Sequence, residues 1–330
     1  MSNYRTAESV SPKHPDKICD QISDAILDAH LALDPDARVA IDVAGGHGKV
    51  FVTGEVTSKA KNIDVGDIVK RLAGQVELIE HIAQQSPEIA QGVDIGGAGD
   101  QGVMVGYACN ETTEMIPLET LLSRQLNQAL YQTWPFDGKT QITLKDGQIA
   151  SVVASFQHAT QAKLRAAVLD WLKSLPASIY QPTSIDLHIN PAGDWSVGGF
   201  EADAGLTGRK LIVDNYGPRV PIGGGAFSGK DPSKVDRSAA YMARKVAIDY
   251  LTARQASEVY VYLAYAIGYD QPLEATVTID GRQEPVTGYD LSPSGIIDYL
   301  QLKRPQYEQT AQYGHFGHAD FAWENPRQLG

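Results

Sequence analysis

The sequence predicts an α+β fold of three similar domains related by pseudo-threefold repetition, each a small, mostly antiparallel sheet backed by helices. Three times, a helical pattern is followed by a two-stranded hairpin and then by another helix. The copies recur every ~100–130 residues, about one domain length. The expected domains are 1–92, 93–199 and 200–330. No residue-level repeat accompanies the pattern, so a chance succession of ordinary α+β modules stays open.

The first copy is predicted from hydrophobic periodicity, since Ile18, Ile22 and Ile26 recur every fourth residue. Its predicted elements are a helix over 17–33, strands over 38–44 and 50–56, and a helix over 65–82. The same helix carries Asp20, Asp24 and Asp28 at i, i+4 and i+8. We interpret this acidic row as a solvated helix face, the usual role of such charge runs, rather than as a row of metal ligands.

The second and third copies repeat this order. The second has predicted helices over 118–133 and 160–175 and strands over 140–145 and 148–156. The third has predicted helices over 233–254 and 293–302 and strands over 259–267 and 274–279.

Composition narrows the function. The 330 residues include 43% hydrophobic ones, enough for a buried core, and 28 basic against 40 acidic residues give a net charge of −12. Nucleic acids and anionic membranes are therefore not expected partners. The two cysteines form no metal or disulfide pattern. No stretch approaches the ~18 apolar residues of a membrane span, and no apolar signal region opens the chain, so we expect a cytoplasmic protein.

The glycine-rich segment Gly223–Ser238 (GGGAFSGKDPSKVDRS) predicts binding of a magnesium-bound polyphosphate. Glycines let backbone N–H groups approach phosphate oxygens, and the helix that follows begins with a partial positive charge. Lys230, Lys234 and Arg237 can neutralise anionic oxygens. Asp231 and Asp236 are candidate ligands for a hard cation.

Two glycine motifs are misleading. Gly224–Lys230 matches half of a P-loop, but Asp231 stands where that loop needs Ser or Thr. Gly97–Gly102 spells G-x-G-x-x-G, yet the residues after it, 103–107, predict a strand instead of the helix that a dinucleotide fold requires. Neither a P-loop fold nor a Rossmann site is predicted.

Three smaller groups are ambiguous alone. The first helix begins with His14, Pro15, Asp16 and Lys17, which present an imidazole, a carboxylate and an ammonium group from one helix end. An incidental capping segment explains these residues equally well. Arg209 and Lys210 follow a glycine turn and precede a predicted strand over 211–214; they suit phosphate or an ordinary exposed loop. His315 and His318 lack a third ligand, so a surface turn is favoured over a metal site.

Taken together, these segments resemble the S-adenosylmethionine synthetase (methionine adenosyltransferase) family from Thr6 to Glu324. The segments that carry the resemblance are HPDK at 14–17, DQISDAILDA at 20–29, TGEV at 53–56, QSPEIAQGV at 85–93, GAGDQG at 97–102, GYACNET at 106–112, INP at 189–191, GLTGRK at 205–210, the Gly223–Ser238 segment and YGHFG at 313–317.

The resemblance implies the reaction and the assembly. Members make S-adenosylmethionine from ATP and L-methionine and hydrolyse the triphosphate to phosphate and diphosphate. They are homodimers, which can pair into tetramers, of three similarly folded domains with active sites at the subunit interface. The implied cofactors are two Mg2+ ions per site, with K+ as a further candidate.

The resemblance also implies residue roles. Asp16 and Asp236 would hold magnesium and Asp42 potassium. The implied catalytic residues are His14, Lys139, Arg209 and Lys230. The implied ATP-binding residues are His14, Asp137, Lys139, Trp195, Asp203, Arg209, Lys210, Ala226, Lys230 and Ile267. The implied methionine-binding residues are Glu55, Gln85, Asp100, Asp203 and Lys234.

The chain departs from the family pattern at three places. Asp42 replaces the usual Glu and is one methylene shorter, which leaves potassium dependence open. Asp194, before Trp195, replaces a cation. The active-site lid between Gln85 and Asp100 is shortened. Two alternatives therefore stay beside an active synthetase: a noncatalytic binding or regulatory relative, and a phosphotransferase or polyphosphatase that uses the same cations.

Overall fold

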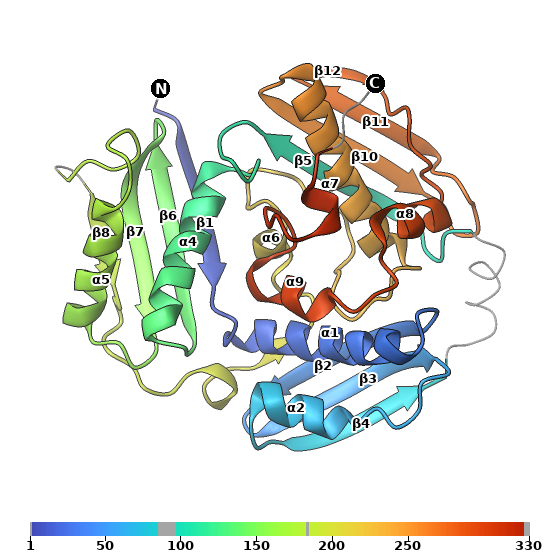
Figure 1. Cartoon of the computed structure of the whole chain (residues 1–330). Coiled ribbons are helices and arrows are strands. Elements are labelled where there is room, and N and C mark those ends of the chain that lie inside the picture. The colour runs from blue at the N-terminus through green and yellow to red at the C-terminus, as the bar shows by residue number, and fades with distance from the viewer. Residues whose placement is uncertain (1, 85–96, 183–184, 327–330) are drawn as a thin grey trace.

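The computed structural model describes residues 2–84, 97–182 and 185–326. Within them lie three four-stranded sheets with helices packed against them (Figure 1), which confirms the predicted α+β class. The strand orders are β1-β6-β7-β8, β12-β11-β10-β5 and β4-β3-β2-β9. The hairpins β2–β3, β6–β7 and β10–β11 are the ones the sequence predicts. The pairs β3–β4 and β7–β8 are parallel, and the other named strand pairs are antiparallel.

Each sheet has its own helices. The first contains β1 (Tyr4–Val10), β6 (Gly138–Lys145), β7 (Gln148–Phe156) and β8 (Asp186–Ile189), with α4 (Leu118–Thr133) and α5 (Gln161–Lys173). The second contains β5 (Gly102–Cys109), β10 (Glu258–Tyr265), β11 (Glu274–Ile279) and β12 (Arg282–Pro285), with α7 (Val235–Arg254) and α8 (Pro293–Leu300). The third contains β2 (Arg38–Gly46), β3 (Lys49–Thr57), β4 (Glu77–Ala83) and β9 (Gly205–Leu206), with α1 (Pro15–Leu33) and α2 (Val65–Ala73).

The short elements lie in the C-terminal half. They are α6 (Leu211–Asp214), α9 (Tyr307–Tyr313) and the 3-10 turns Gly199–Glu201 and Ala322–Glu324.

The sheets combine strands that are distant in sequence. β1 pairs with β6, β5 pairs with β10, and β9 pairs with β2. These pairings bring the predicted phosphate-binding segments to the first helix of the chain. The boundaries 1–92, 93–199 and 200–330 stay a prediction.

Helix α1 lies between the third sheet and α9 (Figure 1). The predicted stripe of Ile18, Ile22 and Ile26 is buried and packs toward β2. Asp20 and Asp24, on another side of the helix, are also fully buried. The predicted solvated acidic face is therefore wrong, because other segments of the chain cover this side of α1.

Two predicted elements are also wrong. The segment 65–82 is not one helix, because α2 ends at Gly74, whose φ of 80° is a left-handed conformation, and β4 then pairs in parallel with β3. The segment 211–214 is the helix α6 instead of a strand. It is a single short turn between other elements, and its apolar run cannot be distinguished from a strand by periodicity.

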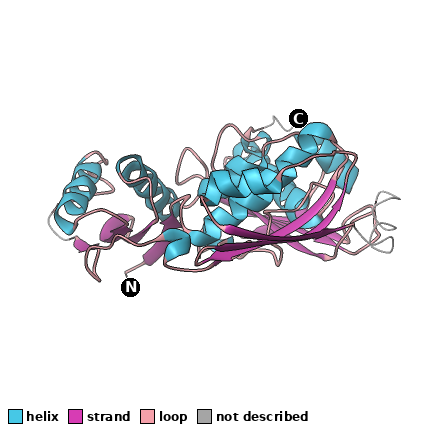
Figure 2. Cartoon of the chain, turned by 90° about the horizontal axis from the view of Figure 1, so that it is seen from below, coloured by secondary structure: helices cyan, strands magenta, loops and turns pink. Residues whose placement is uncertain are grey.

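The helices lie mainly on one side of the second and third sheets, and the strands form the opposite side of this part of the molecule (Figure 2). Phe51 and Ile79 are exposed on β3 and β4, and Val103 is exposed on β5. Among the described residues, no helix is long and apolar enough to span a bilayer.

The close packing of β5 on α7 depends on Gly106. A Cβ there would lie 2.1 Å from backbone atoms of Ala243. We expect Gly106→Ala to lower the free energy of unfolding by about 1–3 kcal/mol, because the helix must shift away from the strand. Urea unfolding measures this change. Gly224→Ala, where a Cβ meets no atom within 4 Å, is the matched control, and equal stability of the two variants would contradict the packing argument.

Candidate functional site

The imidazole of His14 caps the N-terminus of α1. Its Nδ1 accepts the N–H of Asp16 at 3.2 Å. Burial first, and then the charge of Lys210, lower the pKa of His14 to about 4. The ring is therefore neutral near pH 7, and because Nδ1 accepts a hydrogen bond, the proton lies on Nε2. His14 can donate a hydrogen bond to an oxygen without carrying a charge.

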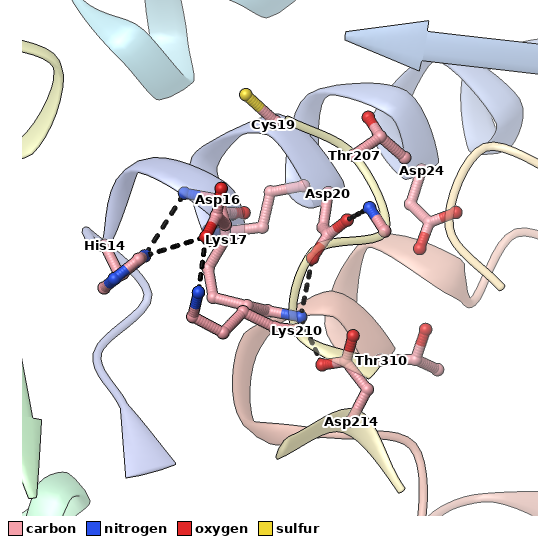
Figure 3. Close-up of polar contacts among 12 residues, drawn as sticks. His14, Asp16, Lys17, Cys19, Asp20, Asp24, Thr207, Lys210, Asp214 and Thr310 are labelled. Atoms are coloured by element: carbon pink, nitrogen blue, oxygen red, sulfur yellow. Dashed lines mark hydrogen bonds and ion pairs between the residues drawn. The ribbon is translucent and has the colours of Figure 1, made fainter. Parts of the chain in front are cut away.

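The carboxylate of Asp16 faces two cations, Lys210 and Arg209, and Figure 3 shows its contact with Lys210. Oδ2 is ion-paired with Lys210 Nζ, and Oδ1 accepts the Leu206 N–H at 3.0 Å and lies 3.6 Å from Arg209 Nη1. Burial alone would raise the pKa of Asp16, but the hydrogen bonds from Lys210 and Leu206 outweigh it and hold this pKa below its ordinary value. Asp16 is therefore charged at neutral pH.

Other predicted residues surround His14. Lys139 on β6 forms a 2.7 Å ion pair with Glu8, and its charge helps to lower the pKa of His14. The charge of Asp203 favours a higher pKa of His14. Asp137 Oδ2 accepts a backbone N–H at 3.0 Å, and burial raises the pKa of this carboxyl. Strand β6, helix α1 and the loop before β9 thus bring these side chains into one group.

A second charged pair lies at the start of α7. Lys230 Nζ is 2.6 Å from Asp236 Oδ2. The backbone of Lys230 forms a β-bridge with Ala40 on β2, which fixes the loop before α7 against the third sheet. A Cβ on Gly225 would lie 2.1 Å from the carboxyl carbon of Asp236, so the glycine is required for this approach. Asp236 lines a small cleft with Val103, which belongs to β5.

The loops that hold the two pairs touch one another. A Cβ on Gly208 would lie 2.7 Å from the Cβ of Ala226. Gly208 precedes Arg209 and Lys210, and Ala226 lies four residues before Lys230. Arg209, Lys210 and Lys230 therefore come from adjacent loops.

Trp195 lies against Gly198, where a Cβ would lie 2.6 Å from its ring. It is half-buried, and its Nε1 donates to Asn190 Oδ1 at 3.3 Å. The preceding Asp194 accepts the N–H of Gln161 at 2.7 Å, in the first turn of α5. Asp194 thus accepts a hydrogen bond from a backbone N–H group at the N-terminus of α5.

The remaining predicted residues are more dispersed. Asp42, Glu55, Asp100 and Ile267 are exposed, and within the described residues no hydrogen bond or ion pair joins them to His14 or Lys230. Gln85 lies outside the described residues, as does most of the segment between it and Asp100.

Three charged residues of the glycine-rich segment have structural partners. Arg237 is fully buried and forms a two-pronged ion pair with Asp24, at 2.6 and 3.0 Å, so it cannot neutralise phosphate as the sequence suggested. Lys234 is paired with Asp231, which also accepts the Val39 N–H at 2.8 Å. Asp231 therefore fixes the loop to β2.

Sequence reasoning missed the role of the acidic face of α1, which we define as Asp16, Asp20, Asp24 and Asp28. Each of these carboxylates accepts at least one backbone N–H from a distant segment. The i, i+4 spacing is the same for a solvated face and a buried one, so the spacing alone does not reveal this role.

The two charged pairs fit a divalent cation that takes most of its ligands from a substrate. Asp16 and Asp236 are carboxylates of the kind that hard cations prefer, and each now faces an ammonium group. In the described part of the chain, no cluster of three or more His, Cys, Asp or Glu could hold a metal without other ligands. Phosphate oxygens and water would complete such a site.

Neutral His14, two lysine-paired carboxylates and cations from adjacent loops are groups of the kind that bind a polyphosphate and a hard cation. Models of one protein family match three successive parts of the chain. The S-adenosylmethionine synthetase N-terminal domain matches residues 2–91, the central domain 95–195 and the C-terminal domain 197–325. The chain belongs to the S-adenosylmethionine synthetase family.

Curated proteins of the same family are similar to this chain over nearly its whole length. The S-adenosylmethionine synthase of Salinibacter ruber is 44% identical over 370 residues, covering 98% of this chain and 96% of the relative. That of Clostridium tetani is 41% identical over 385 residues, covering 100% and 98%. The first alignment exceeds the 330 residues of this chain by 40, so the relative has segments that this chain lacks.

His315 is not on a surface turn, as the sequence suggested, but fully buried beside Tyr241, whose OH lies 2.7 Å from its Nδ1. Burial first, and then the charge of Arg237, hold the pKa of His315 well below its ordinary 6.5.

This burial predicts a pH effect on stability. The folded state keeps His315 neutral, whereas the unfolded chain binds a proton below pH ~6.5, so stability falls as the pH is lowered from 7.5 to 5.5. The limiting slope from this one group is about 1.4 kcal/mol per pH unit. Urea unfolding at several pH values measures the slope, and His315→Gln should make it shallower. An unchanged slope in that variant would show that His315 does not titrate on unfolding.

Proposed function

We propose that this chain transfers the adenosyl group of ATP to the sulfur of L-methionine and then hydrolyses the triphosphate to phosphate and diphosphate. The observation that carries the proposal is the group of Lys139, Arg209 and Lys210 around neutral His14 and Asp16, with the Lys230–Asp236 pair on an adjacent loop, in a chain of this family.

The chemistry explains this charge pattern. A lone pair of the methionine sulfur forms a bond to C5′ of the ribose, and the C5′–O bond breaks with its electron pair left on the triphosphate. The product is a sulfonium ion, and negative charge develops on the departing oxygen. Catalysis therefore consists mainly of positioning and of electrostatic stabilisation of the leaving group.

We assign His14 to the bridging oxygen. A neutral imidazole with its proton on Nε2 can donate to that oxygen as its charge grows, and the N–H of Asp16 fixes the ring. Arg209 and Lys210 would hold phosphate oxygens beside Asp16, and Lys230 would do so beside Asp236. Lys139, which is exposed and paired with the half-buried Glu8, would exchange that partner for phosphate.

We assign two magnesium ions to Asp16 and Asp236. Bound there, the ions would neutralise phosphate charge and so make triphosphate a better leaving group. Potassium at Asp42 stays a prediction, since this exposed side chain has no second protein ligand assigned to it.

We also propose a homodimer, able to pair into a tetramer, with the active site at the subunit interface. Phe51 and Ile79 expose apolar surface on the third sheet, and Asp42 and Glu55 are exposed on the same sheet. A partner lying over this sheet would cover the apolar side chains and bring further groups to the dispersed residues. Glu55, Gln85, Asp100, Asp203 and Lys234 remain our assignment for methionine, and Asp137, Trp195, Asp203, Ala226 and Ile267 for the nucleoside.

The reaction itself is the first test. We expect the purified protein to form S-adenosylmethionine from ATP, L-methionine and Mg2+, with phosphate and diphosphate as the other products, by chromatography of the reaction mixture. Absence of the product across a range of K+ concentrations would favour a noncatalytic relative. Phosphate release at full rate without methionine would favour a polyphosphatase.

Lys230 gives the test of the leaving-group assignment. We expect Lys230→Ala to reduce kcat by roughly 100-fold or more, because loss of one positioned donor to developing charge costs about 3 kcal/mol. Steady-state assays at saturating ATP and methionine measure it. Lys173→Ala, which removes an exposed lysine paired with Asp170, is the control. Turnover of Lys230→Ala close to that of the control would remove Lys230 from the mechanism.

A further inference from the structure

We propose that Asp20 and Asp24 are positioning residues that fix where Arg209, Lys210 and Lys230 present their charges to the triphosphate. The proposal rests on the proposed function and extends it to two side chains that do not reach the substrate. Both are fully buried, so they act through the loops they hold.

Asp20 holds the first loop. Its Oδ1 accepts the Gly208 N–H at 2.8 Å, and Oδ2 lies 3.0 Å from Lys17 Nζ (Figure 3). Lys17 is itself buried and also contacts Asp214 at 2.5 Å. The charge of Asp20 is thus compensated within the protein, and its remaining acceptor faces the residue just before Arg209 and Lys210.

Asp24 holds the second loop in the same way. Its Oδ1 accepts the Gly229 N–H at 2.8 Å, and both of its oxygens accept from Arg237. Arg237 also donates to the carbonyl of Lys230 at 3.1 Å. The residue that follows the anchored amide is again a predicted phosphate-binding cation.

The two anchors share a conformation. Gly208 has φ 77° and Gly229 has φ 81°, a left-handed backbone that glycine adopts at little cost. Each glycine turns the chain just before its cation, and each turn is fixed by one carboxylate of α1. Because Asp20 and Asp24 are four residues apart on one helix, their anchor points are separated by a rise of about 6 Å along α1. The helix therefore sets the spacing between the two turns that precede these cations.

The edge of β2 supports the same loops but does not fix the turns. Thr207 exchanges hydrogen bonds with Val43, and Ile41 donates to the Gly229 carbonyl. The amides of Gly208 and Gly229 are left for the carboxylates. Burying a carboxylate is costly, and here Lys17 and Arg237 offset that cost. A displacement of about 1 Å at a catalytic group can cost about 100-fold in rate.

Asp28 provides an internal control. It lies on the same side of α1 and accepts the N–H groups of Gln306, Tyr307 and Glu308 at the start of α9. None of these residues precedes a predicted phosphate-binding cation. Asp28 thus shares the chemistry of Asp20 and Asp24 but has a purely structural task.

The experiment compares Asp20→Asn, Asp24→Asn and Asp28→Asn in the full chain. In each variant, an NH2 group replaces one carboxylate oxygen. One N–H group that the carboxylate accepted in the unmodified protein then faces another donor and loses its hydrogen bond. We expect all three to lower Tm, but only the first two to lower kcat by about 10- to 100-fold, with the KM for methionine within about twofold. Equal kcat losses in all three, or unchanged kcat in the first two, would overturn the proposal.

Two measurements keep this test separate from folding and from the reaction. Calorimetric binding of inorganic triphosphate needs no methionine and no chemistry, and it should weaken in Asp20→Asn and Asp24→Asn but not in Asp28→Asn. If the unmodified protein forms no S-adenosylmethionine, the proposed function fails while this binding pattern still decides the positioning role. In the unmodified protein, the Gly208 and Gly229 amides should exchange hydrogen as slowly as interior amides of α1. Fast exchange would overturn the proposal even if the variants do not fold.

Discussion

The buried acidic face of α1 is the constraint on which the arrangement of the site depends. Carboxylates removed from water must be matched by donors or cations. Asp20 and Asp24 obtain theirs from Lys17, Arg237 and the amides of two distant loops. Folding α1 against the third sheet therefore also recruits the segments that precede α6 and α7. The contacts that compensate the buried charges of Asp20 and Asp24 are therefore the same contacts that hold the two loops.

This arrangement suits a reaction whose difficulty is a highly anionic leaving group. The cations are already held before substrate arrives, by Asp16 and Asp236, so little reorganisation is needed when phosphate oxygens and metal ions replace these internal partners. Neutral His14 adds a hydrogen-bond donor. Because it carries no charge, it attracts nearby carboxylates less strongly than an imidazolium would. The same cations would retain triphosphate after adenosyl transfer, which places its hydrolysis in the same site.

Much of the fold follows from periodicity, and the failures have physical causes. The helices α1, α4 and α7 and the three hairpins were predicted because their patterns extend over many residues. Strand β4 was missed because the apolar spacing of 65–82 continues past Gly74, and only pairing with β3 distinguishes the two halves. The grouping of His14 with Lys139 and Lys210 was predicted from the family resemblance. The burial of Asp20 and Arg237 depends on which segments cover α1, and no local pattern encodes that.

Asp42, Glu55 and Ile267 are exposed, although substrate roles are predicted for the last two and potassium binding for the first. A transfer to sulfur requires that water be excluded from C5′, and a site open along a sheet would leave that carbon accessible. The polyphosphate cluster of one chain supplies cations, but the apolar surface of Phe51 and Ile79 lies on the third sheet without a cover among the described residues. A second copy over this sheet would satisfy both needs at once. Division of the site between subunits is thus the arrangement that a one-sided sheet and an anionic leaving group jointly favour.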